Sequence, residues 1–201
     1  ECNHSRTDRD QRWRGGDEVM SVYFVRHGES LANVNGTAAG AEDDSPLTEK
    51  GLCDAQAVAR EITKRIATGE LHINKIVSSP LRRARQTAEI ISQEALGGLP
   101  VEIDQRWRER EIGKAAGMKH GTWYHLEDDP AAGVETRQAF CERVAEAYDE
   151  LAGLSENILV VSHNGVYRAL QAYMHHVSPE KFVEMSGLGN CEIIEITKEK
   201  M

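Results

Sequence analysis

The chain has 201 residues, of which 40% are hydrophobic and 28% are charged. That length suits one ordinary domain, and the composition is typical of a globular chain rather than a disordered one. The formal net charge of −9 argues against nucleic-acid and anionic-membrane partners, because both carry negative charge themselves. No apolar run in the sequence approaches the length needed to cross a bilayer. We therefore expect a soluble protein with no nucleic-acid and no membrane partner.

The first 19 residues differ in character from the rest. Residues 1–19 are almost wholly polar and mix both charges without helical or strand periodicity, so they have little apolar surface to bury. We expect a flexible N-terminal tail over 1–19, without a secretory signal, and a single domain over 20–201. The four cysteines are widely scattered and form no C-x-x-C pair. This pattern favours free thiols in a reducing compartment, so we expect a cytoplasmic protein.

Strand and helix signals alternate along the first half of the chain. Thr48 is a good N-cap for a first helix, while Ser79 as N-cap and Pro80 at the first helical position form the start signal of a second. Gly97 and Gly98 end that second helix. In chain order, we expect a buried strand over 21–25, a helix over 48–67, a short strand at 76–77, a helix over 80–96 and a third strand over 101–103.

The second half continues this alternation after a loop-rich excursion. Residues 114–133 show no firm period and contain glycines, histidines and acids. Beyond them we expect an amphipathic helix over 140–151, an uninterrupted apolar strand over 158–161, a helix from Val166 and a last strand over 193–196. Alternating strands and helices predict the α/β class, as a three-layer sandwich in which helices flank a mainly parallel sheet.

Three polar segments follow predicted strands at separate points of the chain. Arg26-His27 follows the first strand, Arg82-Arg83 lies early in the helix after the second strand, and His163-Asn164 follows the strand over 158–161. In open α/β sheets the ligand crevice lies at the carboxyl ends of strands, so these three segments can converge there. Two arginines and two histidines in one pocket would attract a dianion such as phosphate.

The expected pocket contains groups suited to phosphoryl transfer. A histidine can attack a phosphoryl group and hold it as a phosphohistidine, and arginines can offset the charge on the transferring oxygens without a metal. No clustered carboxylates suggest a metal cage. A departing alkoxide needs a proton, so a carboxylic acid should lie near the pocket mouth. Glu109 and Glu111 are both candidates, although acids interleaved with arginines can also be simple surface ion pairs.

Four motifs occur in an order that is itself informative. They are R-H-G-E-S at 26–30, P-L-T-E-K-G at 46–51, S-S-P-L-R-R-A-R-Q-T-A at 78–88 and V-V-S-H-N-G-V at 160–166. R-H-G alone would be a weak signal, but the four motifs together are a strong one. They resemble the histidine phosphatase superfamily, in the branch that contains cofactor-dependent phosphoglycerate mutases and related phosphatases. The resemblance covers about Ser21 to Ile196 and implies a mixed-sheet α/β sandwich, phosphoglycerate mutase-like in fold.

The resemblance implies a role for each matching position. It makes His27 the nucleophile and the domain over 20–201 a catalytic domain. The family's acid lies four residues before a glycine, which is Gly113 here and selects Glu109 over Glu111. The residues expected to hold phosphate or substrate are Arg26, Asn33, Arg83, His163 and, beside it, Asn164.

These features predict a phosphatase that hydrolyses a small phosphomonoester through a phosphohistidine, without a cofactor or a metal. The segment between residues 109 and 135 is short and lacks the adjacent arginine pair that glycolytic mutases use on their substrate carboxylate, which favours a phosphatase. A cofactor-dependent phosphoglycerate mutase and an inert phospho-ligand binding domain are the alternatives.

Arg82 is expected to be a solvated surface charge. Four further residues either line the pocket mouth or are solvated: Lys114, Lys119, His120 and His125.

Overall fold

The computed structural model describes residues 21–196, so the expected tail over 1–19 lies outside the described residues. Its centre is a five-stranded sheet in the order β3-β2-β4-β1-β5. Strands β1 to β4 are mutually parallel where they pair, and β5 runs antiparallel to β1. This confirms the mainly parallel mixed sheet. The strands are β1 (Val22–Arg26), β2 (Lys75–Ser78), β3 (Val101–Ile103), β4 (Ile158–Ser162) and β5 (Ile193–Ile196).

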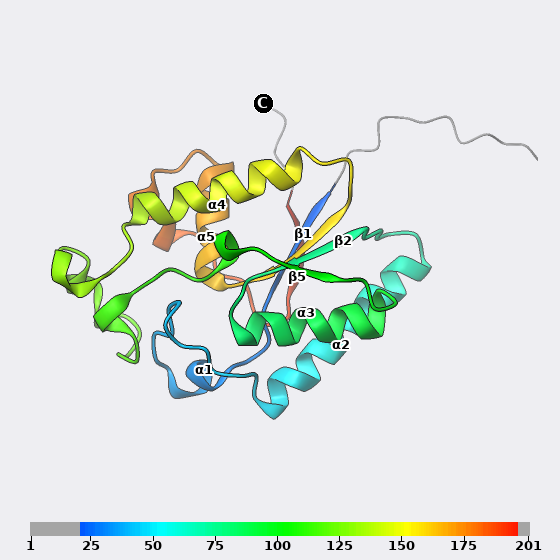
Figure 1. Cartoon of the computed structure of the whole chain (residues 1–201), viewed down its shortest axis with the longest axis horizontal. Helices are drawn as coiled ribbons and strands as arrows, with labels where there is room; N and C mark the ends of the chain where they lie inside the picture. Colours follow the sequence, from blue (N-terminus) through cyan, green and yellow to red (C-terminus); the bar gives the residue numbers. More distant parts are fainter. Residues whose placement is uncertain (1–20, 197–201) are drawn as a thin grey trace, which may run out of the picture.

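Helices cover both faces of the sheet, which confirms the three-layer sandwich. In Figure 1, α4 (Arg137–Ala152) lies above the sheet and α5 (Asn164–Met174) lies under α4, to the left of the strands, while α2 (Glu49–Ala67) and α3 (Arg82–Ala95) lie below the sheet. The first two helices pack on one face of the sheet and the last two on the other. Thr48 caps α2 as expected, since its side-chain oxygen accepts a hydrogen bond from Gly51 N–H. Among residues 21–196, no helix has both the length and the apolar character that a bilayer span requires.

The two faces of β1 belong to different cores. Val22 and Phe24 pack with α4 and α5, whereas Tyr23 and Val25 pack with α2 and α3. This alternation follows from the twofold side-chain period of a strand. Burial of each such side chain contributes roughly 1.5–3 kcal/mol. The apolar contacts on both faces therefore hold β1 firmly, and with it the position of the chain that follows.

The start of α3 differs from the expectation. Ser79 is not the N-cap and Pro80 is not helical, because the helix begins two residues later at Arg82. The Ser79 hydroxyl instead accepts a hydrogen bond from Leu81 N–H at 3.3 Å, which is a local turn. The first helical N–H, that of Arg82, donates to the carboxylate of Asp44 at 2.6 Å. A side chain from another loop thus caps α3, and nothing in the local sequence signalled this.

Short elements complete the fold. One α-helical turn, α1 (Leu31–Asn35), follows the first motif and was not expected. The remaining elements are 3₁₀ turns, namely η1 (Gln105–Trp107), η2 (Gly113–Ala115), η3 (Tyr124–Leu126), η4 (Pro130–Ala132) and η5 (Pro179–Glu184). Three of them interrupt the expected loop-rich excursion over 114–133 or lie at its edge.

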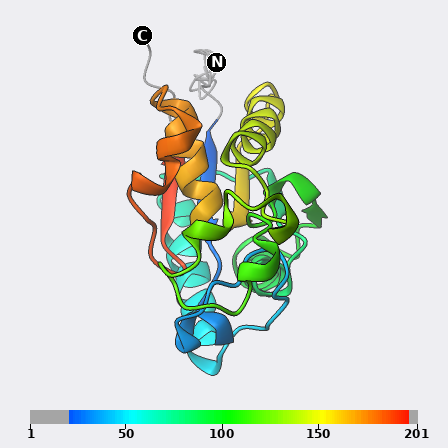
Figure 2. The ribbon, with the colours of Figure 1, turned by 90° about the vertical axis from the view of Figure 1, so that its left-hand side faces the viewer.

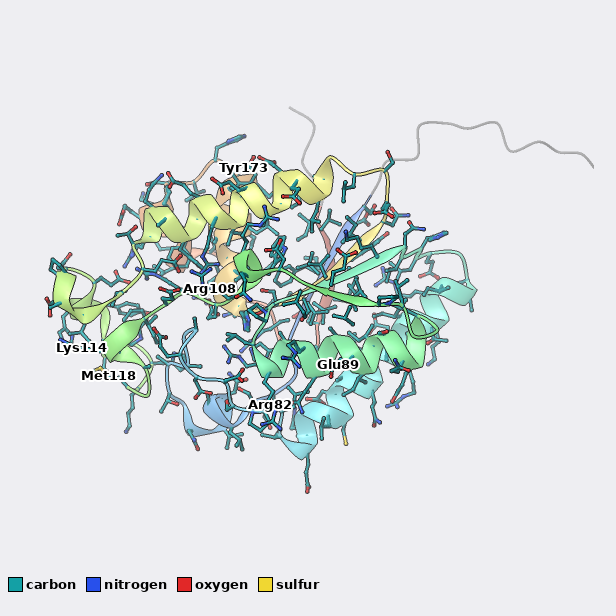
Figure 3. All side chains as sticks on the ribbon, in the orientation of Figure 1. Arg82, Glu89, Arg108, Lys114, Met118 and Tyr173 are labelled. Atoms are coloured by element: carbon teal, nitrogen blue, oxygen red, sulfur yellow. The ribbon has the colours of Figure 1, made fainter. Side chains whose placement is uncertain are left out.

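The loop-rich segment over 114–133 packs with residues 38 and 112 into a small third core at one end of the molecule. Ala38, Ile112, Ala115 and Trp123 are buried together there, apart from the two main cores. Figure 3 marks this end by Lys114 and Met118, and Figure 2 turns it toward the viewer. Backbone hydrogen bonds between Ala38 and residues 117 and 118 tie it to the loop after α1.

We predict that Asp44→Ala lowers the free energy of unfolding by about 0.5–1 kcal/mol, because it removes the acceptor for the first N–H of α3. Urea denaturation at constant pH measures the change. Asp128→Ala is the matched control, since Asp128 is also exposed but lies away from α3. An equal loss in both variants would mean that the contact with Arg82 contributes nothing specific.

Candidate active site

The site lies where β1 and β4 end. The two strands are parallel neighbours, and Arg26 is paired in register with Ser162. The long helix after β1 packs on one face of the sheet, and α5, after β4, packs on the other. When the chain continues from one strand to one face of a parallel sheet and from the neighbouring strand to the other face, a crevice forms at the carboxyl ends of the two strands. His27 and His163 are the next residues after the two strands. His27 lines the cavity at this edge, whereas His163 is fully buried and is not one of the lining residues.

His27 is almost fully buried, and both of its ring nitrogens have a partner. Nδ1 lies 2.7 Å from the carbonyl oxygen of Gly28. Nε2 lies 3.3 Å from Nε of Arg83. A carbonyl oxygen accepts and a guanidinium donates, so we assign the ring proton to Nδ1 and the lone pair to Nε2. This tautomer presents the lone pair of Nε2 on the side of Arg83.

Backbone carbonyls hold the two arginines. Arg83 has only 2% of its surface exposed, and its two terminal nitrogens donate to Asp43 O at 2.5 Å and to Gly40 O at 3.0 Å. Arg26 donates from Nη1 to Leu188 O at 2.7 Å. Arg26 also has a buried Nε without a hydrogen-bond partner among the described residues. Neutral carbonyl acceptors fix both guanidinium groups and leave their positive charge available to an anion.

His163 directly precedes α5 and lies beside His27. It is fully buried, and its ring centroid is 5.1 Å from that of His27. Nε2 lies 2.7 Å from the hydroxyl oxygen of Ser79, which also accepts a hydrogen bond from Leu81 N–H. We assign the hydroxyl proton to the contact with Nε2 and the ring proton of His163 to Nδ1, which has no partner within residues 21–196. Ser79, expected as a helix cap, is thus the side-chain partner of His163.

Both histidines are held in the neutral state. Burial lowers the pKa of each well below the usual 6.5, and the positive charge of Arg83 lowers it further. For His27, the hydrogen bond to Gly28 opposes this shift only in part. A buried charge without a partner is costly, so neutral imidazole is favoured. At neutral pH the Nε2 lone pair of His27 is consequently unprotonated.

Glu109 lies in the same cavity, and Glu111 does not. The two carboxylate oxygens of Glu109 accept hydrogen bonds from the N–H groups of Arg110 at 2.9 Å and of Gly165 at 3.1 Å. The side chain of Glu111 is 49% exposed and pairs with Arg108. Of the two candidates, the structure thus places Glu109, which the glycine spacing selects, in the cavity that His27 also lines.

The amides expected to contact substrate are held by the loop before β5. Asn164 accepts a hydrogen bond from Leu188 N–H at 2.8 Å. Asn190, which sequence reasoning missed, donates to the carbonyl of His27 at 2.7 Å and contacts Asn33 Oδ1 at 3.4 Å. Asn33 and Asn164 line the cavity. Asn190 thus holds the backbone of His27 from a distant point in the chain. The sequence around residue 190 contains no motif that would have predicted this contact.

The cavity is about 250 Å³, and its lining reaches from His27 to Trp123 and Phe182. Arg110 lines it, but its charge is matched by Glu127 at 2.6 Å.

Of the four candidates for the mouth, only His120 lines the cavity, and Lys114, Lys119 and His125 do not. Arg82 is exposed on α3, as expected (Figure 3). The outer wall is largely apolar and consists of Ala38, Ala39, Ile112, Trp123, Tyr124, Phe182 and Val183.

No three histidine, cysteine, aspartate or glutamate side chains within residues 21–196 gather in a way that could hold a metal ion. The cavity instead contains cationic side chains around His27, with Arg26 and Arg83 at the inner end and Arg168 further along α5. Burial lowers the pKa of Arg26, the negative charge of Glu109 opposes this by raising it, and the positive charge of Arg168 lowers it. Such a region attracts a phosphate group.

We predict that stability falls as the medium becomes acidic, because the unfolded chain binds protons on both histidines below about pH 6.5 while the folded chain resists them. The free energy of unfolding is highest above that pH and decreases below it. The double variant His27→Gln/His163→Gln should lose less stability between about pH 7.5 and about pH 5.5 than the unmodified chain. Replacing the exposed His72 and His175 by Gln is the control. Equal slopes for the two double variants would contradict the prediction.

Comparison with known proteins places the chain in a family. The profile of the histidine phosphatase superfamily (branch 1) matches residues 22–200. The chain is 29% identical to the glucosyl-3-phosphoglycerate phosphatase of Mycolicibacterium vanbaalenii, over 89% of this chain and 84% of that protein. It is 33% identical to a probable phosphoglycerate mutase of Erwinia tasmaniensis, over 90% and 86% of the two chains. The solved structure of the α-ribazole phosphatase from Shigella flexneri is 26% identical, with a TM-score of 0.73 over 89% of this chain and 90% of that one. This chain belongs to the histidine phosphatase superfamily, branch 1.

Proposed function

We propose that this chain is a phosphatase that hydrolyses a small phosphomonoester through a phosphohistidine on His27. One observation carries the proposal. Neutral His27, whose Nε2 lone pair accepts a hydrogen bond from Arg83, lines one cavity with two arginines and a carboxyl group, and a second neutral histidine packs against its ring. These groups match the needs of a nucleophile, of charge stabilisation and of proton transfer.

The first step transfers the phosphoryl group to the enzyme. Nε2 of His27 attacks phosphorus, and the nitrogen–phosphorus bond forms while the bond from phosphorus to the ester oxygen breaks. Glu109, in its acid form, gives its proton to that oxygen, and the alcohol departs. Arg26 and Arg83 offset the charge on the transferring oxygens, so we propose that the step needs no metal and no cofactor.

The second step releases phosphate. Water attacks phosphorus, Glu109 takes a proton from that water, and the nitrogen–phosphorus bond breaks. The products are inorganic phosphate, neutral His27 and protonated Glu109, so the enzyme returns to its starting state. The N–H on Nδ1 of His163 is suited to donate to a phosphoryl oxygen in both steps, because this buried donor has no partner among the described residues.

Phosphate release distinguishes this function from mutase activity. The two curated relatives named above are a phosphatase and a probable mutase. The segment between 109 and 135 lacks an adjacent arginine pair, which supports hydrolysis. The chain is incubated with phosphoglycerates and with a panel of other phosphomonoesters, with a chelator present, and both inorganic phosphate and isomer are measured. Isomer formation without phosphate release would assign the chain as a mutase, and binding without either product would make it an inert binding domain.

We propose a cytoplasmic location on chemical grounds. Cys53, Cys141 and Cys191 are all free thiols, and each belongs to the described part of the chain. Free thiols suit a reducing compartment.

We predict that His27→Ala abolishes turnover while the fold is retained, because the variant removes the attacking nitrogen. The unmodified chain, quenched during turnover, should carry phosphate in a form that is labile to acid and stable to base, as a phosphohistidine is. His72→Ala is the matched control, since His72 is exposed. Undiminished turnover in His27→Ala would remove His27 as the nucleophile.

We predict that Glu109→Gln slows turnover of an alkyl phosphate by about a hundredfold to ten-thousandfold, while an aryl phosphate with a good leaving group is much less affected. An alkoxide needs the proton that Glu109 supplies, whereas an activated phenolate departs largely unaided. Glu111→Gln is the matched control and should change little, because Glu111 is exposed and pairs with Arg108. Selective loss in Glu111→Gln, and not in Glu109→Gln, would show that the acid is misassigned.

A further inference from the structure

Gly165, the second residue of α5, lies directly against the carboxyl group of Glu109. Its N–H donates to Oε2 of Glu109 at 3.1 Å, and Arg110 N–H donates to Oε1 at 2.9 Å. Two backbone donors from separate segments thus orient the carboxyl group. Each carboxyl oxygen has two lone pairs, so both hydrogen bonds leave room for the proton that Glu109 transfers.

The position of this carboxyl group also depends on the missing side chain of Gly165. A Cβ atom on Gly165 would lie 2.2 Å from Oε1 and 3.0 Å from the carboxyl carbon of Glu109. Carbon and oxygen cannot approach to 2.2 Å without a bond, so one of the two groups would have to move. The observed carboxyl position therefore requires glycine at residue 165.

The backbone does not explain this glycine. Gly165 is not among the described glycines with a positive φ, and it lies within a helix, where alanine is more favourable than glycine by roughly 0.5–1 kcal/mol. The three nearest contacts of a Cβ at this position are all with Glu109 side-chain atoms. The absence of a side chain at Gly165 therefore leaves room for the Glu109 carboxyl group, and no backbone conformation requires it.

We propose that Gly165 is a positioning residue that places the acid Glu109 for proton transfer to the leaving oxygen. This inference rests on the proposed function. Gly165 has no chemical role itself, because it acts through the position of Glu109. Proton transfer needs hydrogen-bond distance to the accepting atom, and displacement by about 1 Å can cost a hundredfold in rate.

The test is Gly165→Ala, assayed on an alkyl phosphate and on an aryl phosphate with a good leaving group. The Glu109 carboxyl group is the far end of a flexible side chain, so it can swing aside and the fold is retained. We expect kcat on the alkyl phosphate to fall by about tenfold to a hundredfold, with a much smaller change on the aryl phosphate. Gly153→Ala is the matched control, because its Cβ would make ordinary contacts at 3.4 Å or more, away from the site. An equal loss on both substrates would overturn the proposal, since it would indicate general disruption of the site.

A double variant separates positioning from other effects. In the Glu109→Ala background, Gly165→Ala should cause no further selective loss, because the acid that it displaces is already absent. If Gly165→Ala alone fails to fold, Gly165→Ala/Glu109→Ala should fold, since the clash is removed, and failure of the double variant would overturn the proposal. If Glu109→Gln shows no leaving-group selectivity, the assignment of the acid fails. If Glu109→Gln is selective and Gly165→Ala is not, only the role of Gly165 fails.

Discussion

The site depends on one buried guanidinium. Arg83 is almost completely inside the protein and bonds to His27 and to the carbonyls of Gly40 and Asp43. Taking such a charge out of water is costly unless hydrogen bonds satisfy it. The carbonyl groups supply these bonds without neutralising the charge, as a carboxylate would. The positive charge of Arg83 in turn lowers the pKa of both histidines, which helps to keep them neutral.

The same bonds connect segments that carry different parts of the site. The loop held by Arg83 also contains Glu42, whose carboxylate accepts hydrogen bonds from the N–H groups of Ile112 and Gly113. Gly113 has a φ of +50°, and a Cβ there would lie 2.1 Å from the carbonyl oxygen of Ala132. Only glycine fits this turn. Gly113, from which Glu109 was selected as the candidate acid, thus has a physical role of its own, because it allows the chain to pass close to the backbone of Ala132.

The layers and most of the site could be predicted from sequence because their signals are local. Apolar runs and helical periodicity indicate the strands and helices, and polar residues immediately after β1 and β4 must meet at one edge of a parallel sheet. The contacts that refine the site are not local. Asp44 caps α3 from 38 residues away, and Asn190 bonds to the carbonyl of His27 across 163 residues. No window of sequence contains both partners of either contact.

The sequence also did not predict which individual side chains reach the cavity or which hydrogen bonds they make. His120 lines the cavity while Lys119, its neighbour in sequence, does not, and both lie in a segment without a period. Ser79 carried a strong local signal as a helix cap, but its hydroxyl bonds to His163 instead. Competing side-chain hydrogen bonds of this kind override local preferences when a buried imidazole needs a partner.

The small core at the outer end of the cavity has a consequence for motion. Trp123 and three partners form a cluster separate from the two cores that hold the sheet. A unit with its own few apolar contacts can open at a free energy well below that of global unfolding. We therefore expect the backbone N–H groups around Trp123 to exchange with solvent faster than those of the central sheet. Trp123 also lines the cavity, so the local stability of this cluster and the shape of the cavity depend on the same few apolar contacts.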